Sequence, residues 1–345
     1  MVVGDVTTGT EVLVIGAGPG GYVAAIRAAQ RDLDVTLVER DAYGGVCLNR
    51  GCIPSKAYIT ATGVAHDAAT AEEMGVYADP AVDLATMREW KDGVVDRLTG
   101  GVEKLCKANG VTLMEGTAKF VDSETVRVEH DGEGQGAETV AFDHCIVATG
   151  SRPVSIPGFD FADDPVLDAA QLLDLDTVPD RLVVVGAGYI GMELSSVFAT
   201  LGSDVTVVEM LDDVLPGYED DVARVVRKRA EALGVDFHFG EGATGWRDGA
   251  DGGIVVTTET DDGVESTYGT DRVLVAVGRE PVTGTLDAEN AGLDPTADGF
   301  LETDDRCETA VDGIYAVGDV AGEPMLAHTA SAEGIVAAEA IAGEP

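Results

Sequence analysis

The sequence predicts an α/β fold with two Rossmann-like dinucleotide-binding domains. A unit of strand, glycine turn, helix, strand and acidic residue occurs twice, and both copies have the same internal spacing. In each unit a helix directly follows a short apolar strand, which is the order that places helices against a parallel sheet. The length of 345 residues also exceeds the usual size of one hydrophobic core, so more than one domain is expected.

The first unit begins with the apolar run EVLVI at residues 11–15. Three glycines follow, at Gly16, Gly18 and Gly21. A helix-compatible stretch and a second strand, VTLVE, then lead to Glu39. Glycines permit a tight turn and close approach of the backbone, so a pyrophosphate can lie at the helix N-terminus. The Glu39 carboxylate is placed to accept hydrogen bonds from a ribose.

The second unit repeats this order from residue 181. The strand RLVVV precedes Gly186, Gly188 and Gly191, and a helix and the strand VTVVE then end at Glu209. The acid lies 23 residues after the first glycine in both units. A single GxGxxG is weak evidence because glycine turns are common, whereas two complete copies predict two dinucleotide sites.

The residues after this strand favour NAD over NADP. The 2'-phosphate of NADP usually meets an Arg near the end of the strand. Here Glu209 is followed by Met210, Leu211, Asp212 and Asp213, so the strand end carries only negative charge.

Charge and hydropathy exclude several kinds of partner. Acidic residues number 63 against 22 basic ones, and the net charge of −41 opposes binding to nucleic acid or to an anionic membrane surface. No apolar run reaches the roughly 18 residues that span a bilayer and no signal sequence is evident, so a cytoplasmic protein is expected. The acidic residues are spread along the chain, which is typical of extreme halophiles; an ordinary acidic enzyme is the alternative.

Two cysteines follow the first unit. Cys47 and Cys52 lie in the segment GGVCLNRGCIPSK, residues 44–56. A regular helix would hold positions i and i+5 apart, so a broken turn, permitted by Gly45 and Gly51, must bring the sulfurs within disulfide reach. Five cysteines in all do not indicate a structural disulfide framework. Any disulfide here is therefore expected to be catalytic.

With this motif the sequence resembles the pyridine nucleotide disulfide oxidoreductases. CLNRGCIPSK is similar to the dihydrolipoamide dehydrogenases of that family, whereas glutathione reductases typically carry Lys where Ser55 stands. Mercuric reductases are the nearer alternative, and a disulfide reductase of another small thiol is a further one. The resemblance implies an E3-type enzyme that passes electrons from dihydrolipoamide through a disulfide and FAD to NAD. It implies that Cys47 exchanges with the substrate and that Cys52 faces the flavin. It also implies that Lys56 and Glu193 pair beside the ring.

The resemblance covers nearly the whole chain and implies further cofactor contacts. Those on the FAD side are Ala118, Thr149, Gly150, Ser151, Asp319, and Met325, Leu326, Ala327 and His328 at the start of a helix. Those on the NAD side are Tyr189, Ala243, and Gly278 and Arg279 at the return crossover. Val282 departs from the Asn that many relatives carry, which would remove one hydrogen bond beside the flavin.

The resemblance also implies the domain order. Residues 1–149 and 279–345 would form an FAD domain, with an NAD domain inserted at 150–278. Acidic, glycine-rich stretches at 131–139 and 247–264 are expected to be hairpin loops.

Several expectations concern what these residues lack. Family members continue for about another hundred residues, roughly one domain, with a His and Glu acid–base dyad at a homodimer interface. Without it the 345-residue chain is expected to be impaired, and a truncated, non-catalytic nucleotide-binding fragment is the alternative from another class. The His-x4-Glu spacing of His328 and Glu333 is interpreted as coincidence. No metal site is predicted, and the remaining thiols are interpreted as core or surface residues: Cys106, Cys145 and Cys307.

Overall fold

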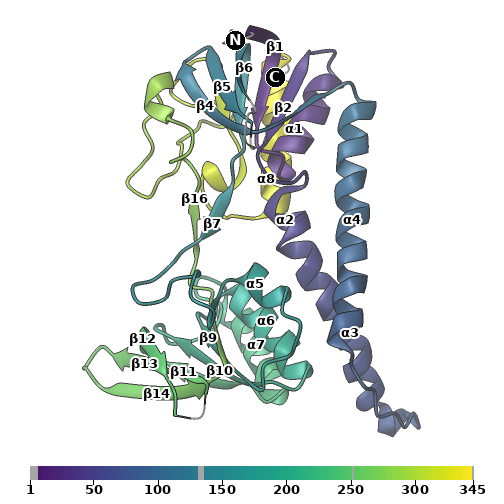
Figure 1. Ribbon diagram of the computed structural model, residues 1–345, viewed down its shortest axis with the longest axis vertical. Helices are drawn as coiled ribbons and strands as arrows, with labels where there is room; N and C mark the ends of the chain where they lie inside the picture. The colour runs from purple at the N-terminus through teal and green to yellow at the C-terminus, as the bar shows by residue number, and fades with distance from the viewer. Residues whose placement is uncertain (1–6, 131–135, 251, 344–345) are drawn as a thin grey trace. The chain divides into compact units, whose positions relative to one another are not determined.

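The structure is a computed structural model that describes residues 7–130, 136–250 and 252–343 (Figure 1). Its contacts divide the chain into two compact units, neither of which is continuous in sequence. Unit 1 comprises Met1–Asn49, Val95–Arg152 and Glu280–Pro345, and unit 2 comprises Arg50–Val94 and Pro153–Arg279.

Unit 1 is built on a seven-stranded sheet in the part of the chain that the structure describes. The strand order is β3-β2-β1-β6-β5-β4, with β17 also paired to β6. The strands β1, β2, β3, β6 and β17 pair in parallel, while β4 and β5 add an antiparallel hairpin. The bounds are β1 Thr7–Ile15, β2 Val35–Glu39, β3 Thr112–Glu115, β4 Thr117–Asp122, β5 Thr125–Glu129, β6 Ala137–Val147 and β17 Ile314–Ala316.

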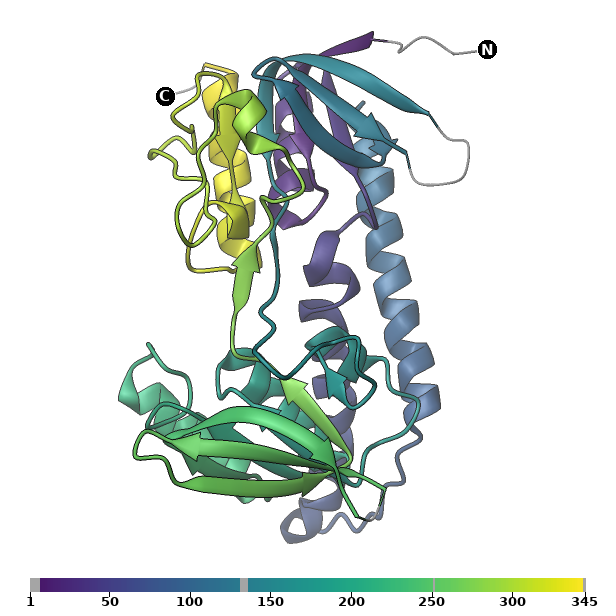
Figure 2. The ribbon, with the colours of Figure 1, turned by 60° about the vertical axis from the view of Figure 1, so that its left-hand side comes forward.

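Two helices of unit 1 pack closely through glycine. Helix α1 (Pro19–Ala29) begins with a proline at its first position, where no amide hydrogen is needed. Helix α8 (Ala327–Ile341) lies beside it (Figure 2). A Cβ on Gly334 of α8 would lie 2.4 Å from the carbonyl oxygen of Gly20, so only glycine permits this approach. The remaining short helices of the unit are α2 (Gly45–Asn49), η2 (Ala288–Ala291) and η3 (Gly318–Val320).

Unit 2 contains a five-stranded parallel sheet in the order β11-β10-β9-β15-β8. The valine-rich strands β9 and β10 are buried as expected of a sheet covered on both faces. The bounds are β8 Val166–Leu167, β9 Arg181–Val185, β10 Asp204–Glu209, β11 Asp236–Phe239 and β15 Arg272–Val275. The helices are α3 (Cys52–Ala69), η1 (Ala71–Met74), α5 (Ala169–Leu173), α6 (Tyr189–Thr200) and α7 (Asp220–Ala232).

A separate three-stranded antiparallel sheet completes unit 2. Its strands are β12 (Glu241–Asp248), β13 (Ile254–Thr260) and β14 (Glu265–Thr270). The stretch expected to be a loop at 247–264 therefore contains a full strand, because IVVTTET alternates buried and accessible positions. Of the other expected loop, 131–139, residues 131–135 lie outside the described residues, and β6 begins at Ala137.

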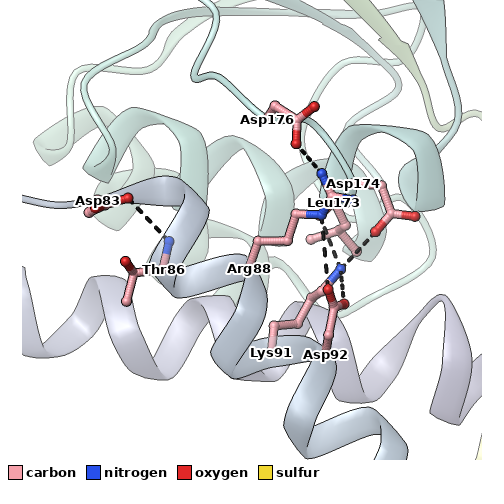
Figure 3. Close-up of polar contacts among 8 residues, drawn as sticks. All are labelled: Asp83, Thr86, Arg88, Lys91, Asp92, Leu173, Asp174 and Asp176. Carbon is pink, nitrogen blue, oxygen red and sulfur yellow. Dashed lines mark hydrogen bonds and ion pairs between the residues drawn. The ribbon is translucent and has the colours of Figure 1, made fainter.

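Residues 50–94 group with unit 2, whereas the expected boundary placed all residues before 150 in one domain. Tyr58 of α3 is 2% exposed and packs in the core of unit 2. Lys91, on the helix α4 (Leu84–Ala108), is 3% exposed; its ammonium group lies 2.7 Å from the Asp174 carboxylate and 3.0 Å from that of Asp92 (Figure 3). The packing of Tyr58 and the ion pairs of Lys91 explain why residues 50–94 belong to unit 2. The assignment of FAD to one domain and of NAD to the other stays a prediction.

Two short strands, β7 (Ser151–Pro153) and β16 (Arg279–Pro281), pair with each other. They lie where the chain leaves unit 1 and where it returns. No helix among the described residues is long and apolar enough to cross a bilayer.

Candidate nucleotide and redox sites

The first glycine turn has the conformation that a bound phosphate requires. Gly16 has φ +100°, and a Cβ there would lie 2.4 Å from the carbonyl oxygen of Ala148. A Cβ on Gly21 would lie 1.8 Å from the carbonyl oxygen of Gly16. Both positions therefore exclude any side chain, and the turn can lead directly from β1 into α1.

The middle glycine of each turn faces open space. Gly18 and Gly188 each precede the first residue of a helix, α1 and α6 respectively, and no atom lies within 4 Å of the position a Cβ would take. The first amide groups of a helix have no partner within the helix, so they can donate to an anion that enters this space. This arrangement fits a pyrophosphate at each turn.

The acid of the first unit is fixed by the backbone. Glu39 accepts hydrogen bonds from the amide of Ala17 at 2.7 Å and from the amide of Asp41 at 2.8 Å, one to each carboxylate oxygen. Each oxygen retains a further acceptor position for a ribose hydroxyl. The carboxylate thus closes the glycine turn and stays available to a ligand.

The second turn repeats this geometry in unit 2. Gly186 has φ +103°, and a Cβ on Gly191 would lie 2.0 Å from its carbonyl oxygen. Glu209 accepts from the amide of Ala187 at 2.7 Å and from the amide of Leu211 at 2.9 Å. The equal sequence spacing of the two units therefore corresponds to equal hydrogen bonding.

The crossover after β6 is joined to residues of the C-terminal part of unit 1. The Ser151 hydroxyl donates to Asp319, which lies in η3. The Thr149 hydroxyl donates to the carbonyl oxygen of Val282 at 2.6 Å, and the amide of Val282 donates to Gly150 at 2.9 Å. The structure therefore brings together four residues expected at the flavin side. Val282 enters this network through its backbone, so its apolar side chain does not disturb it.

Glu333 has a role that its sequence context does not indicate. Its carboxylate accepts a hydrogen bond from the amide of Gly318 at 2.6 Å, one residue before Asp319. The hydroxyl of Ser331, on the same helix, lies 3.4 Å from the carbonyl oxygen of Pro19, at the start of α1. Helix α8 is thus bonded both to the glycine turn and to the turn that carries Asp319. In the sequence Glu333 is marked by its spacing from His328, interpreted above as coincidence, and by its place directly before the helix glycine Gly334.

The other residues expected at the flavin side lie at the start of α8 and in the core of unit 1. Leu326 precedes α8 in an extended conformation, and Ala327 and His328 are the first two residues of that 15-residue helix. Met325 lies just before them and is partly buried. Ala118 is buried in the core of unit 1, so only its backbone can contact a cofactor.

The cysteine motif has the expected break. Cys47 lies in α2, which ends at Asn49, and α3 begins at Cys52. The Asn49 side chain donates to the carbonyl oxygens of Tyr43 and Gly45, at 3.1 and 2.9 Å, and so fixes the end of α2. A five-residue helix that ends before Cys52 and a separate helix that begins there therefore replace the single regular helix that would hold the sulfurs apart.

The hydrogen bond to Glu193 comes from an unexpected residue. The buried Ser55 hydroxyl lies 3.3 Å from the Glu193 carboxylate and 3.3 Å from the carbonyl oxygen of Cys52. The Lys56 side chain is exposed, and among the described residues it forms no ion pair with Glu193. The Lys56–Glu193 pair stays a proposal for the cofactor-bound protein. In the sequence Ser55 indicates only the family, because nothing there joins it to a residue on α6.

The remaining residues expected at the NAD side belong to separate elements. Tyr189 is the first residue of α6 and is 40% exposed. Ala243 lies at a register shift between β12 and β13. Gly278 has φ +151°, and Arg279 begins β16.

The other three cysteines are buried. Burial raises the pKa of the Cys106 thiol to about 11 and, with smaller effects of Glu333 and Asp304, that of Cys307 to about 11. Burial likewise raises the pKa of Cys145. Because the thiolate is the reactive form, these thiols are unreactive near neutral pH.

Comparison with known proteins gives the class. The sequence profile described as pyridine nucleotide-disulphide oxidoreductase matches residues 10–334, and this chain belongs to that family. Dihydrolipoyl dehydrogenase of Haloferax volcanii is 70% identical over the whole chain, which spans 73% of that relative. The protein of the same name from Halobacterium salinarum is 66% identical, again over the whole chain and 73% of the relative.

A solved structure agrees with the fold. LpdA from Mycobacterium tuberculosis has a TM-score of 0.90 at 28% identity, with 97% of this chain and 73% of that chain covered. The family uses FAD and a nicotinamide dinucleotide, and the predicted α/β fold with two such domains is confirmed.

Proposed function

We propose that this chain oxidises dihydrolipoamide with NAD⁺ as acceptor, the activity of a dihydrolipoyl dehydrogenase. The observation that carries the proposal is the 70% identity to the Haloferax volcanii enzyme over the full chain, a span that includes both cysteines of the redox motif. The relatives also come from halophiles, which supports the halophilic interpretation of the net charge.

The residues present fit the two dinucleotides. Unit 1 has an open glycine turn at α1, the Glu39 carboxylate, and Asp319 held by Ser151. Unit 2 has the corresponding turn and Glu209. FAD, when bound, transfers two electrons between a dithiol and NAD. The protein holds each pyrophosphate at a helix start and each ribose at a carboxylate.

The cysteines perform the exchange with the substrate. One thiolate of dihydrolipoamide attacks the sulfur of Cys47 in the Cys47–Cys52 disulfide, so that a mixed disulfide forms and Cys52 leaves as a thiolate. The second substrate thiolate then displaces Cys47, giving lipoamide and a reduced cysteine pair. Of the two protons that leave the substrate thiols, one is released to solvent. The other proton and the two electrons together correspond to the hydride that converts NAD⁺ to NADH. Ser55 lies in the first turn of α3, where its hydroxyl joins the carbonyl oxygen of Cys52 and the carboxylate of Glu193 on α6.

A homodimer is proposed for the whole protein, in agreement with the family resemblance. Unit 2 supports it with large apolar side chains that are strongly exposed: Val64 at 68%, Met74 at 79% and Tyr77 at 80%. Such side chains on so acidic a protein are consistent with a protein interface. A cytoplasmic location is proposed because the five cysteines suit a reducing compartment.

A steady-state assay at molar KCl tests the proposal. We expect NADH formation that depends on dihydrolipoamide, with little activity toward glutathione disulfide or Hg²⁺ with NADPH. A preference for Hg²⁺ and NADPH would contradict it. Anaerobic mixing with dihydrolipoamide tests the remaining alternative, a non-catalytic nucleotide-binding fragment. Reduction of the bound flavin, even without turnover, would show that the cysteines are competent. If the flavin is not reduced, the chain is a nucleotide-binding fragment.

A further inference from the structure

A cation lies beside the strand end where the sequence shows only negative charge. Arg227 projects from α7, and its guanidinium carbon is 4.7 Å from the centre of the Phe239 ring. Phe239 ends β11 and is paired with Glu209 at the end of β10. Arg227 therefore covers the residue that is paired with Glu209, the acid expected to bind the ribose of NAD.

The guanidinium group is held by two carboxylates. Its Nε lies 3.0 Å from Glu231, one turn further along α7, and one terminal nitrogen lies 3.4 Å from Asp213. Asp213 also accepts a 2.8 Å hydrogen bond from the amide of Val214 through the same oxygen. Asp213 thus joins the segment after β10 to α7. A guanidinium group has five N–H donors, and these contacts leave several of them available.

We infer that Arg227 is a specificity-determining residue. Its guanidinium group could bind a 2'-phosphate, but the carboxylate of Asp213 neutralises its charge. An Arg near the end of this strand is the usual partner of the 2'-phosphate of NADP, since its fork of donors matches phosphate oxygens. In this chain the Arg is present but its charge is matched by Asp213 and Glu231, and Glu209 adds a further negative charge at the strand end. The preference for NAD over NADP therefore depends on the pairing of Arg227 with carboxylates, and not on the absence of a cation from the strand end. The inference rests on the proposed binding of NAD in unit 2.

A packing role is the competing explanation. Phe239 is stacked on Phe237 with ring centres 5.5 Å apart, and the Arg227 guanidinium group lies over the Phe239 ring. If packing alone kept Arg227, removing the charge of Asp213 would leave nucleotide preference unchanged.

The test compares binding of NADP⁺ and NAD⁺ to the FAD-bound full chain at fixed KCl, by calorimetry. Asp213→Asn removes the charge and keeps an oxygen that can accept from Val214. We expect its affinity for NADP⁺, relative to that for NAD⁺, to rise by about tenfold, as for one charge-assisted hydrogen bond. The double variant Asp213→Asn with Arg227→Gln is expected to lose this gain.

The matched control is Asp212→Asn, which removes the same charge from the neighbouring exposed residue. An equal gain in the Asp212 variant would show a general charge effect and overturn the inference, as would no gain in Asp213→Asn. Flavin absorbance and circular dichroism verify that each variant is folded. Because binding is measured without dihydrolipoamide, a wild-type chain that binds NAD⁺ while Asp213→Asn gains nothing overturns only this inference. A wild-type chain that binds neither nucleotide overturns the proposed function as well.

Discussion

The carboxylate of Glu333 accepts the amide hydrogen of Gly318 at 2.6 Å, and this bond fixes the turn that presents Asp319. Gly318 has φ +73°, and a Cβ there would lie 2.9 Å from the Cβ of Ala330 on the same helix α8. The turn can therefore approach the helix only with glycine at this position, and Glu333 bonds to it there. Asp319 is oriented by Ser151 from one side and by this turn from the other.

Replacing Glu333 with Ala is expected to weaken FAD binding. A hydrogen bond to a charged group contributes about 1.5 to 3 kcal/mol, so the dissociation constant of FAD rises by about 10- to 100-fold. Flavin fluorescence during titration of the apoprotein measures it. The exposed Glu302, replaced in the same way, serves as the control and is expected to leave the constant unchanged. Equal affinities for the two variants would contradict a role for the Glu333 bond.

The two cysteines of the redox motif are expected to differ in their effect on the flavin spectrum. Two-electron reduction of the wild-type protein opens the disulfide and gives a long-wavelength charge-transfer band from a thiolate to the flavin. Cys52→Ser abolishes this band, whereas Cys47→Ser leaves a thiolate beside the ring. The reverse result would exchange the roles that we assign to the two thiols.

The three buried thiols are expected to be protected from alkylation until high pH. Burial raises the pKa of Cys106 and of Cys307 to about 11, from an ordinary value of 9.0. Iodoacetamide at pH 8 therefore labels only Cys47 and Cys52 in the reduced, folded protein. Mass spectrometry of the labelled peptides checks this, and a denatured sample labelled at all five cysteines is the control.

The same shifts predict lower stability in alkali. A thiol whose pKa is raised in the folded state stabilises the fold fully below the unfolded pKa of about 9, and this contribution decreases as the pH rises toward about 11. Thermal midpoints measured between pH 8 and pH 11 are expected to fall. A midpoint that stays constant over this range would show that the thiols remain accessible to solvent.

Lys91 is expected to stabilise the packing of α4 on unit 2. Lys91→Met removes the bonds to Asp174 and Asp92, and a loss of about 1 to 3 kcal/mol is expected from the loss of charged hydrogen bonds. Denaturant unfolding measures the loss. Lys104→Met, at an exposed position of the same helix, is the control. If both variants unfold at the same denaturant concentration, the ion pairs of Lys91 contribute nothing to stability.

Salt is expected to stabilise the folded, flavin-bound chain. With a net charge of −41, surface carboxylates repel one another over a Debye length of about 30 Å at 0.01 M salt but only about 3 Å at 1 M. The thermal midpoint and FAD retention therefore rise with KCl from millimolar to molar concentrations. A midpoint that stays flat or falls would rule out the halophilic interpretation.

The glycine turns could be predicted because their geometry is encoded locally. Gly16 and Gly21 exclude side chains for reasons that lie within one short stretch of chain, and Glu39 closes the turn 23 residues later. The break between Cys47 and Cys52 follows from the same kind of local constraint. Such features depend on conformations that few residues other than glycine adopt.

The tertiary pairs could not be predicted, because their members lie on different elements. Ser55 meets Glu193 across 138 positions of sequence, and Arg227 reaches the strand end from a helix rather than from the residues after the strand. In the sequence Arg227 lies 18 residues after Glu209, and nothing in that spacing indicates that it returns to the strand end. Such side-chain pairs are determined by how the helices and strands pack, and the spacing of residues in the sequence does not indicate that packing.

The discontinuity of unit 1 has a consequence for synthesis on the ribosome. Helix α1 packs against α8 through Gly20 and Gly334, yet α8 is translated about 300 residues later. At about 5 to 20 residues per second, the nascent α1 and β1 wait for roughly 15 to 60 s before their partner emerges. During that interval the first glycine turn, between β1 and α1, has been synthesised, but helix α8, which packs against α1, has not. Chaperones that bind exposed apolar strands therefore have their longest opportunity at the N-terminal strands.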